Sequence, residues 1–531
     1  MRKIAAAMAM NRISWLALAL VSAGLLVFLY LRLNEFWSIN SDQANALYTA
    51  MAMAAGNWRL HGWTVPPDSF WGLDIALIAL VWAVTGKAIL ALRLVPALAY
   101  LLLGIAAACL CLPGRKSAAR LGASMLLAVA LLVPLHIRNA ETFFSESPMH
   151  FLTVACILGV IGLAARSLTA PPARRWIFLL LYSLLSLDAA LSDPMFTILG
   201  TLPILIALAL ADFPAGAPRI RLAACGIGVT LLAKTLLAIN MATGGFTPSP
   251  TQLAFGRLFA MPRSTGIILK GILDVLACDP FGLSLHQAMI QLLRMPLLLL
   301  VGLPLYRVGE QILGKWWFKR PGSRAPAFIE TGLFLIIALN LAAMQFTAQV
   351  IDIGGIRYLL PAWACAVVLA ARTSKPGLGI NSYYALLLVV GLGADAQAMM
   401  HRAPPAFTPV TQRLATCLES VGLDNGYGVY WRASAVTLAS DGRVTVRAVH
   451  TNITTHAVTP MMWMSTTRWY PTWPPARPFF VITDPKYAGL SNSAVLASFG
   501  TPDSVLKVGS AVVNIYGRHI APGACSGADQ S

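Results

Sequence analysis

The sequence predicts an α-helical polytopic membrane protein, with about eleven transmembrane helices and a small C-terminal domain of α/β or β-rich structure outside the membrane. Three observations indicate this fold class. Hydrophobic residues make up 57% of the 531 residues and charged residues only 11%, whereas soluble domains carry about 25% charged residues. Long apolar segments recur up to residue 398, and basic residues gather in every second loop between them. Beyond residue 398, proline and glycine are frequent and the apolar runs are short.

The apolar segments define the predicted spans. The first, residues 14–31, contains no charge and is long enough to cross the hydrocarbon core. No small-residue cleavage site follows it, so we expect a retained helix rather than a removed signal peptide. The predicted spans cover residues 14–33, 88–112, 121–136, 148–165, 176–192, 196–211, 222–241, 286–305, 328–349, 358–371 and 381–398.

The formal net charge of +18 is explained by membrane topology rather than by nucleic-acid binding. Basic residues cluster in alternate loops, as the positive-inside rule requires of cytoplasmic loops. The N-terminus is therefore predicted to be cytoplasmic, and an odd number of spans places the C-terminal domain outside. The basic clusters are Arg2, Lys3 and Arg12; Arg115, Lys116 and Arg120; Arg166, Arg174 and Arg175; Arg219 and Arg221; Arg307, Lys315, Lys319, Arg320 and Arg324; Arg372 and Lys375.

The carboxylates have the opposite distribution. Up to residue 398, only Asp212 and Glu310 fall in predicted cytoplasmic loops, and Glu330 lies near the inner end of a span. The other acidic residues lie at or near the outer face. Because Asp and Glu contribute little to topology, this bias predicts a polar site at the outer membrane surface.

Residues 399–531 are predicted to form the extracytoplasmic domain. Short β-type runs at 428–431, 443–450, 479–483 and 511–516 alternate with turn signals such as Asp441-Gly442. Cys417 and Cys525 both fall in this domain. In an oxidising compartment such as the bacterial periplasm, we hypothesise a disulfide between them.

The outer loop 34–87 combines two short apolar segments with several aromatic residues. Apolar residues recur at helical spacing from Asp42 to Gly56, which predicts an amphipathic helix in the membrane interface. Residues 73–84 form a second apolar stretch that is too short to span comfortably and ends at Thr85-Gly86. The loop therefore builds a shelf on the outer surface, with Asp42, Asp68 and Asp74 on or near it. By itself, Asp42 is equally well explained as a helix cap or as a reacting carboxylate.

The order of these features resembles the GT-C membrane glycosyltransferases, the group that contains protein O-mannosyltransferases and aminoarabinose–lipid A transferases. The shared layout is an N-terminal span, Asp42 opening an interfacial helix, Gly56-Asn57-Trp58, a second interfacial helix, and the run 93–98 (Arg-Leu-Val-Pro-Ala-Leu). The run 355–361 (Gly-Ile-Arg-Tyr-Leu-Leu-Pro) adds to the similarity, which covers about residues 10–375.

The resemblance implies an enzyme of a bacterial inner membrane that moves a sugar, with inversion, from a polyprenyl-phosphate donor to a glycan, lipid or protein acceptor. Asp42 is then the general base. The lipid phosphate is held by Arg357, with Arg138 as second candidate and Tyr358 beside Arg357. The residues expected to contact the donor, the acceptor or a possible divalent cation are Asp68, Asp74, Glu141, Glu146 and His150. Family members carry Asp-Glu where this chain has Asp42-Gln43, which permits a changed acceptor or a loss of activity.

Other interpretations of these residues stay open. Arg357 can be a snorkelling interfacial residue, Glu141, Glu146 and His150 can form a solvated loop, and Asp193-Pro194 suits a turn. Two other functions are a flippase or transporter of lipid-linked glycans and a non-catalytic polyprenyl-phosphate-binding scaffold. A flippase is expected to place functional charges within its spans. Here the carboxylates gather at the outer surface instead, which favours surface chemistry.

Overall fold

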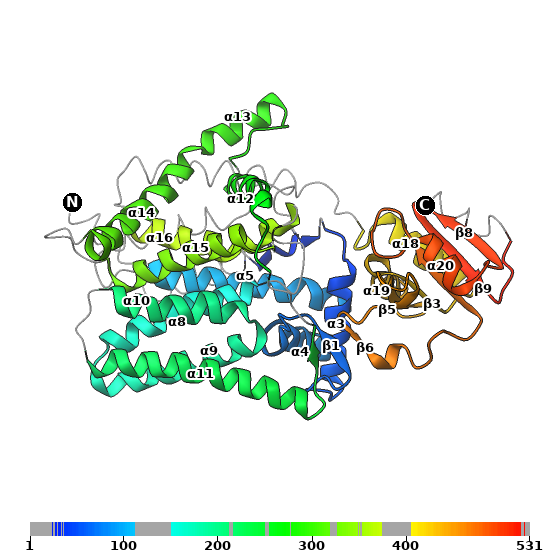
Figure 1. Cartoon of the computed structure of the whole chain (residues 1–531), viewed down its shortest axis with the longest axis horizontal. Helices are drawn as coiled ribbons and strands as arrows, with labels where there is room; N and C mark the ends of the chain where they lie inside the picture. Colours follow the sequence, from blue (N-terminus) through cyan, green and yellow to red (C-terminus); the bar gives the residue numbers. More distant parts are fainter. Residues whose placement is uncertain are drawn as a thin grey trace, which may run out of the picture.

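The computed structural model shows a helical bundle and a C-terminal α/β region that lie end to end along the long axis of the molecule (Figure 1). The structure describes residues 37–111, 150–211, 216–249, 254–276, 278–318, 326–348, 353–373 and 405–521, together with positions 24, 27, 28, 30–32, 34, 35, 350 and 525. The two parts meet at the segment that carries α3 and β1 (Figure 1).

Among the described residues, seven helical segments are long and apolar enough to cross a membrane, and they correspond to seven of the predicted spans. They are α5 (Ala88–Cys111), α8 (Phe151–Thr169), α9 (Pro172–Ser192), α11 (Ala217–Ala242), the continuous α13 (Leu285–Arg294), α14 (Pro296–Ile312) and η4 (Leu313–Trp317), α15 (Phe328–Phe346), and the end of η5 (Ile353–Leu359) with α16 (Leu360–Thr373). The α16 segment is 83% buried and lies at the centre of the bundle, whereas α11 is 17% buried and presents its apolar side chains outward, as a lipid-facing helix does.

Of the other predicted spans, one is a shorter helical segment and the rest lie wholly or largely outside the described residues. Residues 196–211 form η2 (Thr197–Thr201) and α10 (Leu202–Leu210), a helical segment shorter than a full span. The predicted spans 121–136 and 381–398, and most of 14–33, lie outside the described residues. Between the long helices lie η3 (Leu258–Ala260) and α12 (Met261–Val275).

The two short helices predicted in the outer loop, which together we call the shelf, are both present. Its first helix, α3, spans Ser41–Ala54, and its second, α4 (Ala76–Thr85), follows the π-helical turn η1 (Trp71–Ile75). Between them, β1 (Trp63–Val65) pairs in parallel with β2 (Thr247–Pro248) and antiparallel with β6 (Ser465–Thr466). This small sheet therefore ties the shelf to the C-terminal region. The two parts also share one apolar core, in which Leu47 of α3 packs with Leu438 and Met464.

The C-terminal region contains a six-stranded sheet in the order β5-β4-β3-β7-β9-β8. Strands β3, β4 and β7 are parallel, and β5, β8 and β9 pair antiparallel to their neighbours. The elements are α18 (Pro409–Ser420), β3 (Asn425–Val429), α19 (Tyr430–Ala439), β4 (Thr445–Thr451), β5 (Val458–Pro460), η6 (Thr467–Trp469), β7 (Phe479–Thr483), α20 (Asn492–Phe499), β8 (Ser504–Val508) and β9 (Ala511–Tyr516). The predicted strands 443–450, 479–483 and 511–516 correspond to β4, β7 and β9.

The predicted strand 428–431 is wrong at its end, because Tyr430 and Trp431 begin helix α19. Short apolar runs do not distinguish a strand from a buried helix by periodicity alone. The start of α19 lies at the carboxyl end of β3. Asp484 follows the neighbouring strand β7 at the same edge and forms a buried ion pair with Arg432, with a nitrogen–oxygen distance of 2.9 Å.

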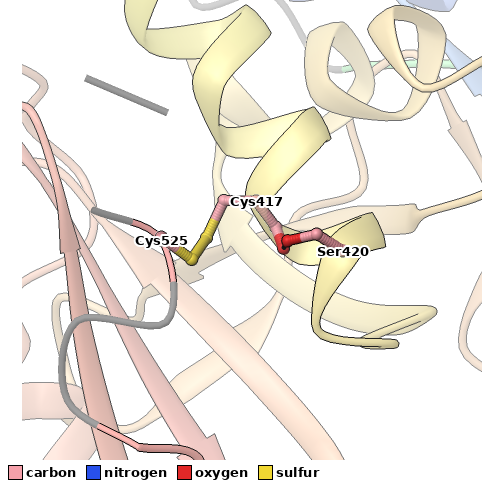
Figure 2. The surroundings of a disulfide bond; sticks show 3 residues. All are labelled: Cys417, Ser420 and Cys525. Atoms are coloured by element: carbon pink, nitrogen blue, oxygen red, sulfur yellow. Dashed lines mark hydrogen bonds between the residues drawn. A yellow bond between two sulfur atoms is a disulfide. The ribbon is translucent and has the colours of Figure 1, made fainter. Parts of the chain in front are cut away.

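A disulfide joins Cys417 of α18 to Cys525, with the Cα atoms 5.3 Å apart (Figure 2). The hypothesis drawn from the sequence is confirmed. The bond fixes the end of the chain to α18, at a position where Ser420 also donates a hydrogen bond to the Cys417 carbonyl.

Candidate active site

Asp42 lies in the first turn of α3, but it is not the cap of that helix. Asn40 is the N-cap residue, and its Oδ1 accepts a hydrogen bond from the Gln43 backbone N–H at 3.1 Å. The Gln43 side chain returns the contact by accepting from the Asn40 N–H at 3.0 Å. Because this reciprocal capping box satisfies the helix end, the interpretation of Asp42 as the cap is wrong.

The same capping box gives Gln43 a structural role. Its side chain is buried at the start of α3, and its amide oxygen makes the contact that a glutamate at this position also makes in capping boxes. The departure from the Asp-Glu pair therefore keeps the local backbone geometry around Asp42.

Asp42 is contacted by the C-terminal region. The Tyr430 hydroxyl, at the start of α19, donates a hydrogen bond to Asp42 Oδ1. Asn45, one turn along α3, donates to the same hydroxyl at 3.4 Å. Burial raises the pKa of Tyr430 well above its usual range, and the negative charge of Asp42 raises it further. The phenol therefore stays protonated and remains a donor to the carboxylate.

A second group of polar side chains centres on His150, immediately before α8. Its Nδ1 lies 2.6 Å from Oδ2 of Asp193, which directly follows α9, and its Nε2 lies 3.6 Å from Oδ2 of Asp68. Thr153 donates to the same Asp193 oxygen at 2.8 Å. Three segments that are distant in sequence thus hold one imidazole between two carboxylates.

The charged groups of this His150 cluster shift one another's pKa values. Burial lowers the pKa of His150, but the charge and hydrogen bond of Asp193 and the charge of Asp68 outweigh burial and raise it to about 9. Burial raises the pKa of Asp68 to about 6, against the opposing effect of the His150 and Arg357 charges. At neutral pH the imidazole is therefore protonated and both carboxylates are ionised.

Arg357 and Tyr358 belong to the same cluster. Both lie in η5, and the Tyr358 ring centroid is 6.1 Å from that of His150. The Arg357 guanidinium lies 5.3 Å from the centre of the Tyr358 ring, and its charge acts on both Asp68 and His150. The structure thus brings together four residues that the sequence places in one site: Asp68, His150, Arg357 and Tyr358.

Phe70 connects the two groups. Its ring lies 5.4 Å from that of His150, and it belongs to the apolar core that contains Leu47 of α3. Its backbone is left-handed, with φ 52°, and its N–H donates to the Ser192 carbonyl beside Asp193. A left-handed phenylalanine is uncommon and marks a constrained position.

Asp74 lies in η1, the π-helical turn that directly precedes α4. It is only 2% exposed, and its Oδ2 has no hydrogen-bond partner among the described residues. Gly72 lies close by, and a Cβ atom at this position would lie 2.1 Å from Oδ1 of Asp188. The glycine is therefore required for the close packing of η1 against α9.

Two residues of these groups are not predicted from the sequence. The Asp193-Pro194 pair suits a turn, and Asp193 Oδ1 does accept from the Met195 N–H at 2.9 Å, but its other oxygen binds His150. Tyr430 falls in a predicted strand, and no local pattern links it to Asp42, 388 positions away. An aspartate directly after an apolar span, on the side of the membrane where His150 lies, was the available signal for Asp193.

Three predicted residues, Arg138, Glu141 and Glu146, lie outside the described residues, and their roles stay predictions. Within the ranges that the structure describes, no three His, Cys, Asp or Glu side chains come together as ligands of a metal ion.

Comparison with known proteins gives similarity at the level of solved structures. No family model and no curated protein sequence matches the chain. The crystal structure of ArnT from Cupriavidus metallidurans in the apo state aligns with 95% of this chain and 98% of its own, at 13% sequence identity and a TM-score of 0.47. The structure of ArnT bound to undecaprenyl phosphate aligns over the same shares, at 12% identity and a TM-score of 0.43.

Proposed function

We propose that the protein is a membrane glycosyltransferase that moves a sugar from a polyprenyl-phosphate donor to an acceptor hydroxyl at the outer membrane surface. One observation carries the proposal: Asp42, on the interfacial helix α3, is oriented by a protonated phenol from the C-terminal region. A partly buried carboxylate held in this way suits proton abstraction from a hydroxyl group.

The proposed reaction is a single displacement. The acceptor oxygen attacks the anomeric carbon while its proton passes to the Asp42 carboxylate. The bond between the anomeric carbon and the phosphate oxygen breaks, and its electron pair leaves with the polyprenyl phosphate. Because one displacement occurs, the configuration of the anomeric carbon is inverted.

The His150 cluster is proposed to hold the lipid phosphate. Arg357 is suited to grip phosphate through two parallel hydrogen bonds. The protonated His150 adds a second positive charge, and Asp193 fixes its ring by a hydrogen bond at 2.6 Å. Asp68, on the other side of the imidazole, is available to orient the donor sugar. The cluster would thus neutralise the charge that develops on the leaving group.

The test uses purified full-length protein with polyprenyl-phosphate sugars and candidate glycan, lipid and protein acceptors. Asp42→Asn should lower the transfer rate by about 10²–10⁴-fold, because general-base catalysis contributes about that factor. Asp424→Asn is the matched control, since Asp424 is an exposed carboxylate of the C-terminal region. Undiminished transfer by Asp42→Asn would refute the assignment of the base.

A further inference from the structure

An arginine surrounded by aromatic rings lies where β4 faces α3. The Arg447 guanidinium lies 4.1 Å from the centre of the Trp469 ring. The Trp469 ring is in turn 6.1 Å from Tyr48 of α3 and 5.4 Å from Trp63 of β1, both in edge contact. We call Arg447, Trp469, Tyr48, Tyr427 and Tyr470 the Arg447 cluster.

The charge of Arg447 lacks a carboxylate partner in the part of the chain that the structure describes. Burial lowers the pKa of Arg447, and the groups that oppose this effect are the Tyr48, Tyr470 and Tyr427 hydroxyls. Three other arginines of the C-terminal region do pair with acids: Arg432 with Asp484 at 2.9 Å, Arg443 with Glu419 at 2.7 Å and Arg477 with Asp503 at 3.5 Å. Arg447 is thus a partly buried cation that has no acidic side chain paired with it in the described ranges.

The five side chains of the cluster are all partly exposed, so a ligand from solvent can reach them. Flat aromatic faces provide apolar contact area, and the tyrosine hydroxyls add polar groups at their edges. A guanidinium recognises planar oxyanions through paired hydrogen bonds. The combination suits a ligand with an apolar ring face, several hydroxyl groups and a carboxylate.

We propose that the Arg447 cluster binds the carboxylate-bearing sugar of an acidic glycan, a uronic acid residue. The single guanidinium matches a monoanionic carboxylate. A phosphate dianion usually recruits several cations or a helix N-terminus in addition. The carboxylate pairs with Arg447, and the sugar ring packs on Trp469.

The cluster and Asp42 both involve helix α3. Tyr48 follows Asp42 by six residues on α3, a rise of about 9 Å along the helix axis. Binding at Arg447 does not require the transfer reaction, so it is tested by binding alone and stands or falls separately from the proposed function.

The experiment titrates detergent-solubilised full-length protein with trigalacturonate, with neutral maltotriose and with inorganic phosphate by calorimetry. Trigalacturonate should bind, and Arg447→Met should weaken its binding by about tenfold or more, because hydrogen bonds to charged groups are strong. Arg468→Met is the matched control, since it removes the same charge from an exposed position next to Trp469, and it should leave the affinity within about twofold.

Arg447→Lys separates recognition from packing. It keeps the charge and the stem but loses the planar fork, so trigalacturonate should bind more weakly than to wild type although the thermal unfolding midpoint is kept. Maltotriose or phosphate binding as tightly as trigalacturonate would overturn the proposal. Wild-type affinity in Arg447→Lys would also overturn it, and this outcome stays decisive where Arg447→Met does not fold.

Discussion

The Asp42 and His150 groups place aspartates in opposite settings. Asp42 is partly exposed and receives a neutral donor, the Tyr430 hydroxyl. Asp193 is buried and paired with a protonated imidazole, with two further hydrogen bonds from Thr153 and the Met195 N–H. A carboxylate that is oriented but not neutralised can take up a proton. A carboxylate whose charge is balanced by a cation and by hydrogen bonds instead holds that cation in place, as Asp193 holds His150. The first setting suits the proposed role of a reacting group and the second that of a support.

The largest expected effect is on stability, and it separates the two groups directly. Asp193→Asn leaves the buried His150 without its main counter-ion, which should cost about 3–5 kcal/mol. Asp42→Asn keeps an oxygen that accepts from Tyr430 and should cost about 1 kcal/mol or less. Thermal unfolding of the solubilised protein measures both, with Asp424→Asn as the exposed control. Equal destabilisation by the two variants would contradict the distinction.

The next effect is a dependence of stability on pH. The pKa of His150 is raised from an ordinary value near 6.5 to about 9 in the folded protein. Protonated His150 therefore contributes fully to the free energy of unfolding below about pH 6.5. This contribution is lost as the pH rises through about 9, and this loss alone lowers the free energy of unfolding by no more than roughly 1.4 kcal/mol per pH unit. The pKa of Asp193 is lowered and that of Asp68 is about 6, so neither titrates strongly in this window. Burial raises the pKa of Asp74 to about 8, so its deprotonation adds to the loss of stability in wild type and variant alike.

The measurement is the unfolding midpoint between pH 6.5 and 9 for wild type and for His150→Asn. The wild-type midpoint should fall across this range, while that of the variant should be flatter. Parallel curves would show that another group causes the dependence.

Arg357 gives a smaller effect, on the transfer rate. Arg357→Met should reduce transfer by about 10–100-fold, in line with the loss of a charged hydrogen bond worth about 1.5–3 kcal/mol. Arg357→Lys should keep part of the rate, because an ammonium retains the charge without the bidentate geometry. Arg263→Met, on the exposed side of α12, is the control. A steady-state assay with saturating acceptor compares the transfer rates of the three variants with that of wild type. A wild-type rate in Arg357→Met would show that Arg357 does not contribute to the site.

The smallest effect concerns the link between Asp42 and the C-terminal region. Tyr430→Phe removes the donor to Asp42 and should lower the transfer rate by about fivefold, equivalent to about 1 kcal/mol. The acidic limb of the pH–rate profile should move to higher pH, because the Asp42 carboxylate loses a hydrogen bond that favours its ionised form. Tyr487→Phe, which removes a hydroxyl from the same sheet edge, is the matched control. An unshifted profile would argue that Tyr430 only packs.

Much of the membrane part could be predicted from the sequence, because lipid permits few structures other than helices. The same constraint made the shelf predictable, since α3 and α4 are too short to span. Within the site, Asp68, His150, Arg357 and Tyr358 were predicted together through the family resemblance. The Asn40-x-x-Gln43 pattern in the sequence matches a capping box, and it identifies Asn40 rather than Asp42 as the N-cap residue of α3.

The remainder depends on contacts between distant segments. Hydropathy does not report that Tyr430 reaches Asp42, that Asp193 faces His150, or that β6 pairs with β1. The apolar run at 429–431 is compatible with a strand or with a buried helix, and only the packing of α19 on α3 decides between them. The predicted roles of the site residues remain to be tested by the variants above.

The pairing of β6 with β1 has a consequence for the biosynthesis of the chain. Asp42 is synthesised early in translation, whereas Tyr430 and β6 are made several hundred residues later. A nascent chain therefore carries its Asp42 carboxylate unoriented, and the contact is completed only when the last segment has folded against the shelf. A chain truncated before residue 405 should insert into the membrane and show no transfer. Full activity in that truncation would exclude such a late completion.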